Sequence, residues 1–116
     1  MTSGIIINLI NNKKDSLYKD YNLNEIVNLS KTLKIKCVIK ENIKINAFSS
    51  STLLSSGKLS YLKNQIDNNK IDLLVLNYPL TPSQQKNLEK YLNIKVIDRT
   101  GLIIEIFADR ALTSEG

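Results

Sequence analysis

The sequence predicts a single small α/β domain: a four-stranded parallel sheet flanked by helices, in Rossmann-like layers. Short, nearly continuous apolar runs rich in β-branched residues recur along the chain, as in strands covered on both faces. The segments between them carry apolar residues three and four positions apart, which is typical of amphipathic helices. Because these patterns alternate four times, parallel strands joined by right-handed crossovers are favoured. We expect strands at residues 4–10, 35–39, 71–76 and 94–97, in the sheet order second, first, third, fourth.

We expect one helix between the first and second strands along the chain. Asn22 or Asn24 can cap this helix, which would run to about Leu33 or Lys34. Its inward stripe would consist of Leu23, Ile26, Val27, Leu29, Ser30 and Leu33. The alternation over residues 35–39 is imperfect, which favours an edge strand with one wetter face.

Residues 40–56 have the weakest pattern and are expected to form a long loop. Residues 41–46 can extend the second strand, whereas the serines at 49–51 and 55–56 are typical of a loop. The following helix is expected to open at Gly57 and Lys58, with Leu59, Leu62 and Ile66 facing inward.

The second half of the chain has the clearest helix starts. Thr81 can cap a helix with Pro82 at its first position, and Gln84 completes a capping box. The inward residues of this helix would be Leu88, Tyr91 and Leu92. After the fourth strand, Asp98 or Thr100 can cap a last helix, with Leu102, Ile103, Ile106, Phe107 and Ala111 on one face.

Length and composition indicate one domain, residues 1–116, with no membrane span. The chain is long enough for a core, and no run approaches the roughly 18 apolar residues that a spanning helix needs. We therefore expect a cytoplasmic protein. The single cysteine, Cys37, excludes an internal disulfide, and the absence of His excludes an ordinary zinc site. Cys37 lies in an apolar run, so we expect an inert thiol.

The formal net charge is +5, and it is unevenly distributed along the chain. Residues 1–70 contain eleven Lys and five acidic residues, whereas residues 71–116 contain five basic and six acidic residues. A basic surface would suit a polyanion such as RNA. The alternative is a composition bias toward Lys, Asn and Ile that affects every surface position. If the lysines serve RNA binding, those of residues 13–70 should gather on one face with Lys58.

The sequence contains no recognisable catalytic constellation. It has no G-x-x-x-x-G-K-[ST] phosphate-binding loop, no His to act as a base and no G-x-S-x-G elbow. We expect no enzymatic activity and no bound cofactor in this chain.

Two places can bind a ligand. Gly57 and Lys58, after Ser55 and Ser56, can present free N–H groups and a positive charge to an anion at a helix start. Asp98 and Arg99 stand where open α/β sheets place ligands, at the carboxyl end of a strand. The structural alternative is that Asp98 caps the helix and Arg99 pairs with an acid such as Glu105 or Asp109.

Both arginines of the chain lie in its C-terminal region. Only Arg99 and Arg110 are Arg, against fourteen Lys, so the planar guanidinium fork is favoured at these positions over charge alone. Arg110 can serve the junction to a following segment.

Three blocks of sequence resemble the N-terminal domain of HflX-type ribosome-associated GTPases. The first is Ile97-Asp98-Arg99-Thr100-Gly101-Leu102-Ile103, continued by Ile106-Phe107-Ala108, Arg110-Ala111 and Glu115-Gly116. The second is Leu80-Thr81-Pro82-Ser83-Gln84 with Asn87-Leu88-Glu89, and the third is Ser55-Ser56-Gly57-Lys58, where the family usually carries Gly-x-Gly-Lys. The resemblance covers roughly residues 50 to 116 and is generic before that.

The resemblance implies a protein that binds the large ribosomal subunit and splits ribosomes under the control of GTP. This chain would be its rRNA-contacting N-terminal domain, followed in the parent protein by a helical hairpin and the G domain that uses GTP and Mg. On this resemblance, we expect residues 1–116 to be a fragment truncated before the hairpin. The alternatives are a small adenine-nucleotide-binding module, since ATP binding has been suggested for this region of the family, and a purely structural domain that orients the following helices.

Overall fold

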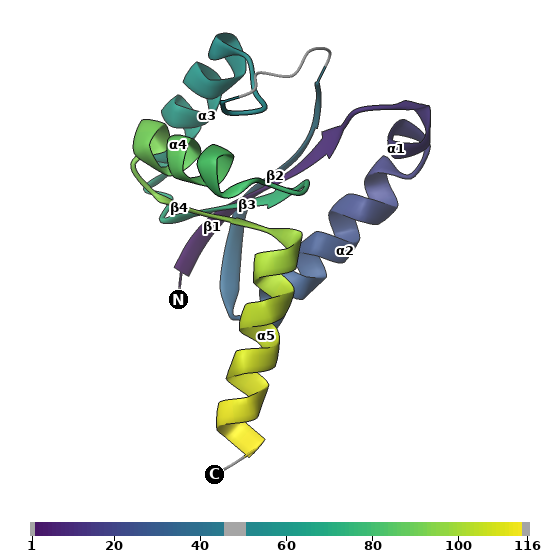
Figure 1. Cartoon of the computed structure of the whole chain (residues 1–116), viewed down its shortest axis with the longest axis vertical. Helices are drawn as coiled ribbons and strands as arrows, with labels where there is room; N and C mark the ends of the chain where they lie inside the picture. The colour runs from purple at the N-terminus through teal and green to yellow at the C-terminus, as the bar shows by residue number, and fades with distance from the viewer. Residues whose placement is uncertain (1, 46–50, 115–116) are drawn as a thin grey trace.

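The computed structural model confirms the four-stranded parallel sheet (Figure 1). It describes residues 2–45 and 51–114, with side chains described as far as residue 110. The strands are β1 (Thr2–Ile10), β2 (Ile35–Lys44), β3 (Leu73–Asn77) and β4 (Lys95–Asp98). Every pair is parallel, and the order β2-β1-β3-β4 is the one that the sequence predicts.

The helices cover both faces of the sheet. They are α1 (Lys13–Leu17), α2 (Lys19–Thr32), α3 (Ser56–Asn69), α4 (Pro82–Leu92) and α5 (Arg99–Ser114). α3 and α4 pack on one face, and α2 and α5 pack on the other. Strand β1 is buried from both sides because Ile5 and Ile7 face α3 and α4 while Ile6 faces α2 and α5. The continuous apolar run therefore reflects a fully covered central strand.

Strand β2 is longer than the predicted 35–39. Residues 40–44, expected in a loop with strand extension as the alternative, pair with Ile6–Ile10 of β1. Ile43 is buried in the core, whereas Lys40 and Lys44 are exposed. An edge strand carries polar residues on its solvent-exposed side, so its apolar pattern in the sequence is weaker than that of a central strand. Of the remaining predicted loop, residues 51–55 belong to no helix or strand, whereas residues 46–50, including Ser49 and Ser50, lie outside the described residues.

The start of the first long helix also differs from the prediction. α2 begins at Lys19, so Asn22 and Asn24 lie inside the helix and do not cap it. The preceding turn forms the short helix α1, because the Asn12 Oδ1 accepts a hydrogen bond of 2.7 Å from the backbone N–H of Asp15. Tyr18 joins the two helices, and its backbone O accepts from the N–H of Asn22 at 2.9 Å.

The capping box of α4 is confirmed, with Thr81 Oγ1 accepting from Gln84 N–H and Gln84 Oε1 from Thr81 N–H. Of its predicted inward residues, Leu88 and Leu92 are buried, but Tyr91 is 45% exposed. The prediction for α5 is likewise wrong for one residue. Leu102 and Ile106 are buried and Ile103 is half-buried, whereas Phe107 is exposed. α5 leaves the sheet after its first turns (Figure 1), so later residues on the same stripe have nothing to pack on. The side chain of Ala111 lies outside the described residues.

Candidate functional site

The carboxylate of Asp98 is engaged on both oxygens. Asp98 Oδ1 accepts a hydrogen bond of 2.8 Å from the backbone N–H of Gly101, which caps α5 as the sequence predicts. Asp98 Oδ2 accepts from the backbone N–H of Leu80 at 3.1 Å. A Cβ at Gly101 would lie 2.9 Å from Ile97 Cγ1, so glycine permits the close approach of helix and strand. Asp98 therefore ties the end of β4 to the segment before α4.

Arg99 pairs with an acid, as the structural alternative expects, but that acid is neither Glu105 nor Asp109. Its Nη2 lies 3.0 Å from Glu25 Oε1 of α2. Glu105 instead pairs with Lys95, also at 3.0 Å, because these side chains meet near the opposite end of β4. Arg99 thus links α5 to α2 on one face of the sheet, and about half of its side chain remains exposed.

Arg110 lies eleven residues after Arg99 on α5, which places it about 16 Å further along the helix axis. Its side chain is exposed. The structure therefore does not bring Arg110 to the Asp98–Arg99 pair.

Gly57 and Lys58 lie in the first turn of α3, as the sequence predicts. The cap is Ser55, whose Oγ accepts from the backbone N–H of Lys58 at 3.3 Å, so this N–H already has a partner. A Cβ at Gly57 would meet nothing within 4 Å. The adjoining hollow also contains Glu41, which accepts a hydrogen bond from the Tyr61 hydroxyl. This hydrogen bond raises the pKa of Tyr61, and the carboxylate weakens the site's preference for an anion.

The two predicted ligand sites lie at opposite edges of the sheet. The hollow beside Gly57 and Lys58 is lined by residues of the edge strand β2, whereas Asp98 and Arg99 follow the other edge strand, β4. Moreover, α3 and α5 cover different faces. A single small ligand does not reach both pairs.

A row of three asparagines crosses the sheet where its strands end, and the sequence did not reveal it. Asn8 Nδ2 donates to Asn42 Oδ1 at 2.9 Å, and Asn77 Nδ2 donates to Asn8 Oδ1 at 2.8 Å. Asn8 Nδ2 also reaches the backbone O of Lys19, at 3.3 Å. The row is therefore satisfied internally and holds the start of α2 against β1 and its neighbours. The sequence signal was an Asn toward the end of three strands: Asn8 in the first predicted strand, Asn42 in the extension of the second, and Asn77 directly after the third.

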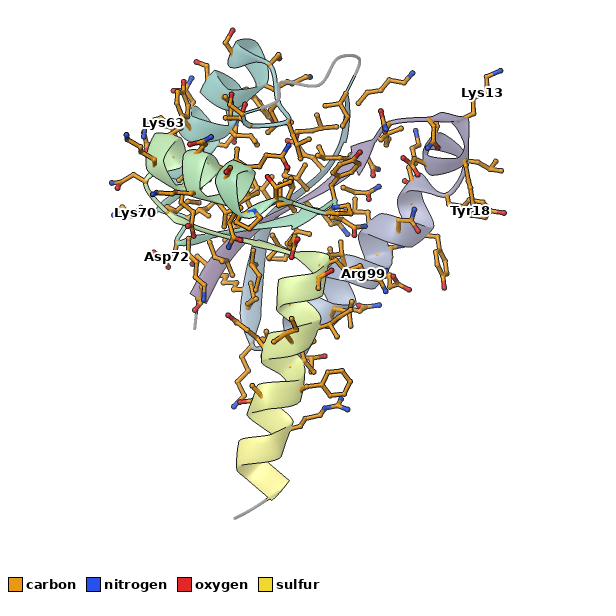
Figure 2. All side chains as sticks on the ribbon, in the orientation of Figure 1. Lys13, Tyr18, Lys63, Lys70, Asp72 and Arg99 are labelled. Atoms are coloured by element: carbon orange, nitrogen blue, oxygen red, sulfur yellow. The ribbon has the colours of Figure 1, made fainter. Side chains whose placement is uncertain are left out.

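The turn between α1 and α2 presents the other feature that the sequence analysis missed. Here three apolar side chains are exposed: Leu17 by 76%, Tyr18 by 49% and Tyr21 by 67%. Exposed lysines flank them, and Figure 2 shows Lys13 and Tyr18 projecting away from the body of the protein. We call this the elbow surface, and it consists of Lys13, Lys14, Leu17, Tyr18, Lys19 and Tyr21.

The remaining candidate chemistry is sparse. In the part of the chain that the structure describes, no three His, Cys, Asp or Glu side chains are grouped to hold a metal ion. Burial raises the pKa of the half-buried Cys37 thiol, although Lys40 and Lys31 oppose that shift. A raised pKa keeps the thiol protonated and unreactive near neutral pH. Among the described residues, no helix has the length and apolarity that a membrane crossing requires.

Comparison with known proteins adds a family to this geometry. The family described as GTP-binding GTPase N-terminal matches residues 20–108. The GTPase HflX of Magnetococcus marinus is 46% identical over 94 residues, which cover 81% of this chain and 22% of that protein. The GTPase HflX of Caldanaerobacter subterraneus subsp. tengcongensis is 35% identical over 113 residues, which cover 97% of this chain and 26% of that protein. The chain thus spans about a quarter of the length of these curated relatives.

A solved structure shares the fold. A GTP-binding protein from the hyperthermophilic archaeon Sulfolobus solfataricus, crystallised in complex with GDP, superimposes with a TM-score of 0.65. The match covers 93% of this chain and 30% of that chain, at 21% sequence identity.

Proposed function

Because the chain belongs to the HflX family of GTPases, as its N-terminal domain, we propose that it contacts the rRNA of the large ribosomal subunit. On this proposal the parent protein associates with ribosomes and splits them. GTP and Mg would bind in the G domain of that protein, after a helical hairpin. This chain would supply binding surface and no catalysis, consistent with the absence of a phosphate-binding loop from its sequence.

The observation that carries the proposal is a lysine-rich surface that the domain does not neutralise itself. Of the fourteen lysines, all in described segments, only Lys63 and Lys95 lie within 4.0 Å of an acidic oxygen among the described residues. Unpaired surface lysines supply the sequence-independent attraction that phosphate backbones require. The lysines do not gather on one face, however: Lys13 lies on the opposite side of the view from Lys63 and Lys70 (Figure 2). The clustering expected for RNA binding is therefore not found, and this scatter agrees with the alternative of a composition bias. The lysines support the proposal by their number and exposure, not by their arrangement.

The adenine-nucleotide alternative has less support. Its two candidate pairs, Gly57 with Lys58 and Asp98 with Arg99, lie at opposite edges of the sheet. Asp98 and Arg99 already have partners within the domain. A purely structural domain remains the competing account, and it predicts no ribosome binding by this chain.

Sedimentation with purified ribosomal subunits tests the proposal. The full chain should pellet with large subunits in preference to small ones, and log K should fall linearly with log salt concentration. With about six phosphate contacts, affinity should fall on the order of 10³ between about 50 and 200 mM salt. No pelleting above the subunit-free control at the lower salt concentration would contradict the proposal and favour the structural role.

A further inference from the structure

We propose that the elbow surface is a stacking platform for unpaired RNA bases. The rings of Tyr18 and Tyr21 would each receive a base, and the neighbouring lysines would hold the adjoining phosphates. This inference rests on the proposed rRNA contact and assigns it to one surface of the domain.

The two tyrosines are presented as a stacking site requires. Tyr18 closes α1 and precedes α2, and Tyr21 follows three positions later, in the first turn of α2. They are 49% and 67% exposed. Neither hydroxyl forms a hydrogen bond with the residues that the structure describes, in contrast to Tyr61, which donates to Glu41. Stacking on exposed aromatic rings is a sequence-tolerant way to bind single strands.

The charges of the elbow favour RNA over a neutral partner. Lys13, Lys14 and Lys19 are exposed and form no ion pair with described residues. The same segment also carries two acids, each of which accepts a hydrogen bond from a neutral group. Asp15 Oδ2 accepts from the backbone N–H of Asn11 at 3.1 Å, and Asp20 Oδ1 accepts from Asn42 Nδ2 at 3.4 Å.

A hollow beside the elbow extends the positive surface. Lys13 lines it together with Lys44, from the end of β2, and with the polar side chains of Asn11, Asn12 and Ser16. Positive charge on one side of the tyrosines gives a bound strand a path for its backbone while its bases reach the rings.

The test uses an RNA oligonucleotide without internal structure, an end-labelled oligouridylate of about ten nucleotides, a length within the range of known single-strand sites. Anisotropy of the label gives the affinity. Because the chain has no Trp, quenching of its tyrosine fluorescence, to which all five Tyr contribute, is a second readout of RNA contact. The paired variants are Tyr18→Leu with Tyr21→Leu, which keeps apolar area, and Tyr18→Phe with Tyr21→Phe, which keeps the rings. Tyr91→Leu is the matched control, because Tyr91 is 45% exposed on α4.

The double Leu variant should bind the oligonucleotide at least about fivefold more weakly, the lower limit for loss of one stacked base. The double Phe variant and Tyr91→Leu should bind within about twofold of wild type. Inorganic polyphosphate, which has no bases, should bind all four proteins equally. Unchanged affinity in the double Leu variant overturns the proposal and indicates an apolar protein contact or none. Equal weakening by Phe and Leu, or an equal decrease in polyphosphate binding, also overturns it.

Binding to large subunits separates this proposal from the one on which it rests. If wild-type chain binds large subunits but fails to bind the oligonucleotide, or if the double Leu variant binds subunits like wild type, only the stacking platform is wrong. If wild-type chain fails to bind large subunits, the proposed function itself is wrong.

Discussion

The β4–α5 junction and the elbow surface use their polar groups in opposite ways. At the junction, both oxygens of Asp98 accept backbone hydrogen bonds, Arg99 pairs with Glu25, and Leu102 is fully buried. At the elbow, three lysines form no ion pair with described residues, and both tyrosines are exposed. The junction carries the clearest family resemblance, whereas the elbow lies where that resemblance is only generic. At the junction, the Asp98 carboxylate and the Arg99 guanidinium are engaged within the domain, whereas the lysines and tyrosines of the elbow stay exposed.

The largest expected difference between the two regions is in stability. Leu102→Ala should lower the free energy of unfolding by about 2–5 kcal/mol, because it leaves a cavity between α5 and the sheet. Leu17→Ala, at the elbow, removes the same side chain from a position that is 76% exposed. It should change stability by less than about 0.5 kcal/mol. Urea unfolding followed by circular dichroism measures both, and equal losses would show that the elbow is packed in solution.

A smaller loss is expected from Asp98→Ala, about 1–3 kcal/mol, because the N–H groups of Leu80 and Gly101 lose their acceptor. Asp98→Asn keeps one carbonyl oxygen and should lose less. At the elbow, Asp20→Ala removes only a long hydrogen bond of 3.4 Å and should cost less than either. Thermal unfolding of the three variants gives the order, and wild-type stability of Asp98→Ala would contradict a structural role for the carboxylate.

Arg99→Lys should have a smaller effect still, below about 1 kcal/mol, since the pair with Glu25 is partly exposed and lysine keeps the charge. A double-mutant cycle with Glu25→Gln isolates the pair from other effects. A loss of about 1–3 kcal/mol in subunit affinity would show that the guanidinium fork binds a partner outside the domain.

The sequence predicted the sheet order, the Thr81 capping box and the Asp98 cap because each depends on local chemistry or on buried apolar runs. It failed where tertiary contacts decide. Phe107 follows the helical stripe of Leu102 and Ile106, but α5 has left the sheet at that position. The extension of β2 depends on pairing with β1, and the partner of Arg99 is Glu25, far away in the sequence.

The candidate site was less predictable than the fold. Motif matching selected Gly57, Lys58, Asp98, Arg99 and Arg110, which the structure distributes over separate places. The elbow was missed because its signal is exposure, and Tyr18 and Tyr21 cannot be distinguished from core aromatics by sequence alone. Lysines are also too frequent in this chain for three more to stand out.

The most direct test of the central claim is the salt dependence of large-subunit binding by two charge-matched variants. One variant replaces Lys13, Lys14 and Lys19 with Gln. The other replaces three exposed lysines away from the elbow with Gln: Lys70, which follows α3, and Lys86 and Lys90, which lie on α4. If the elbow contacts rRNA, the first variant should bind more weakly, and its slope of log K against log salt should be shallower by about 0.7–0.9 for each phosphate that a lysine no longer neutralises. The second variant should overlay wild type. If the two variants have the same affinity and the same salt slope, whether both are weakened or both unchanged, ribosome binding does not belong to the elbow surface.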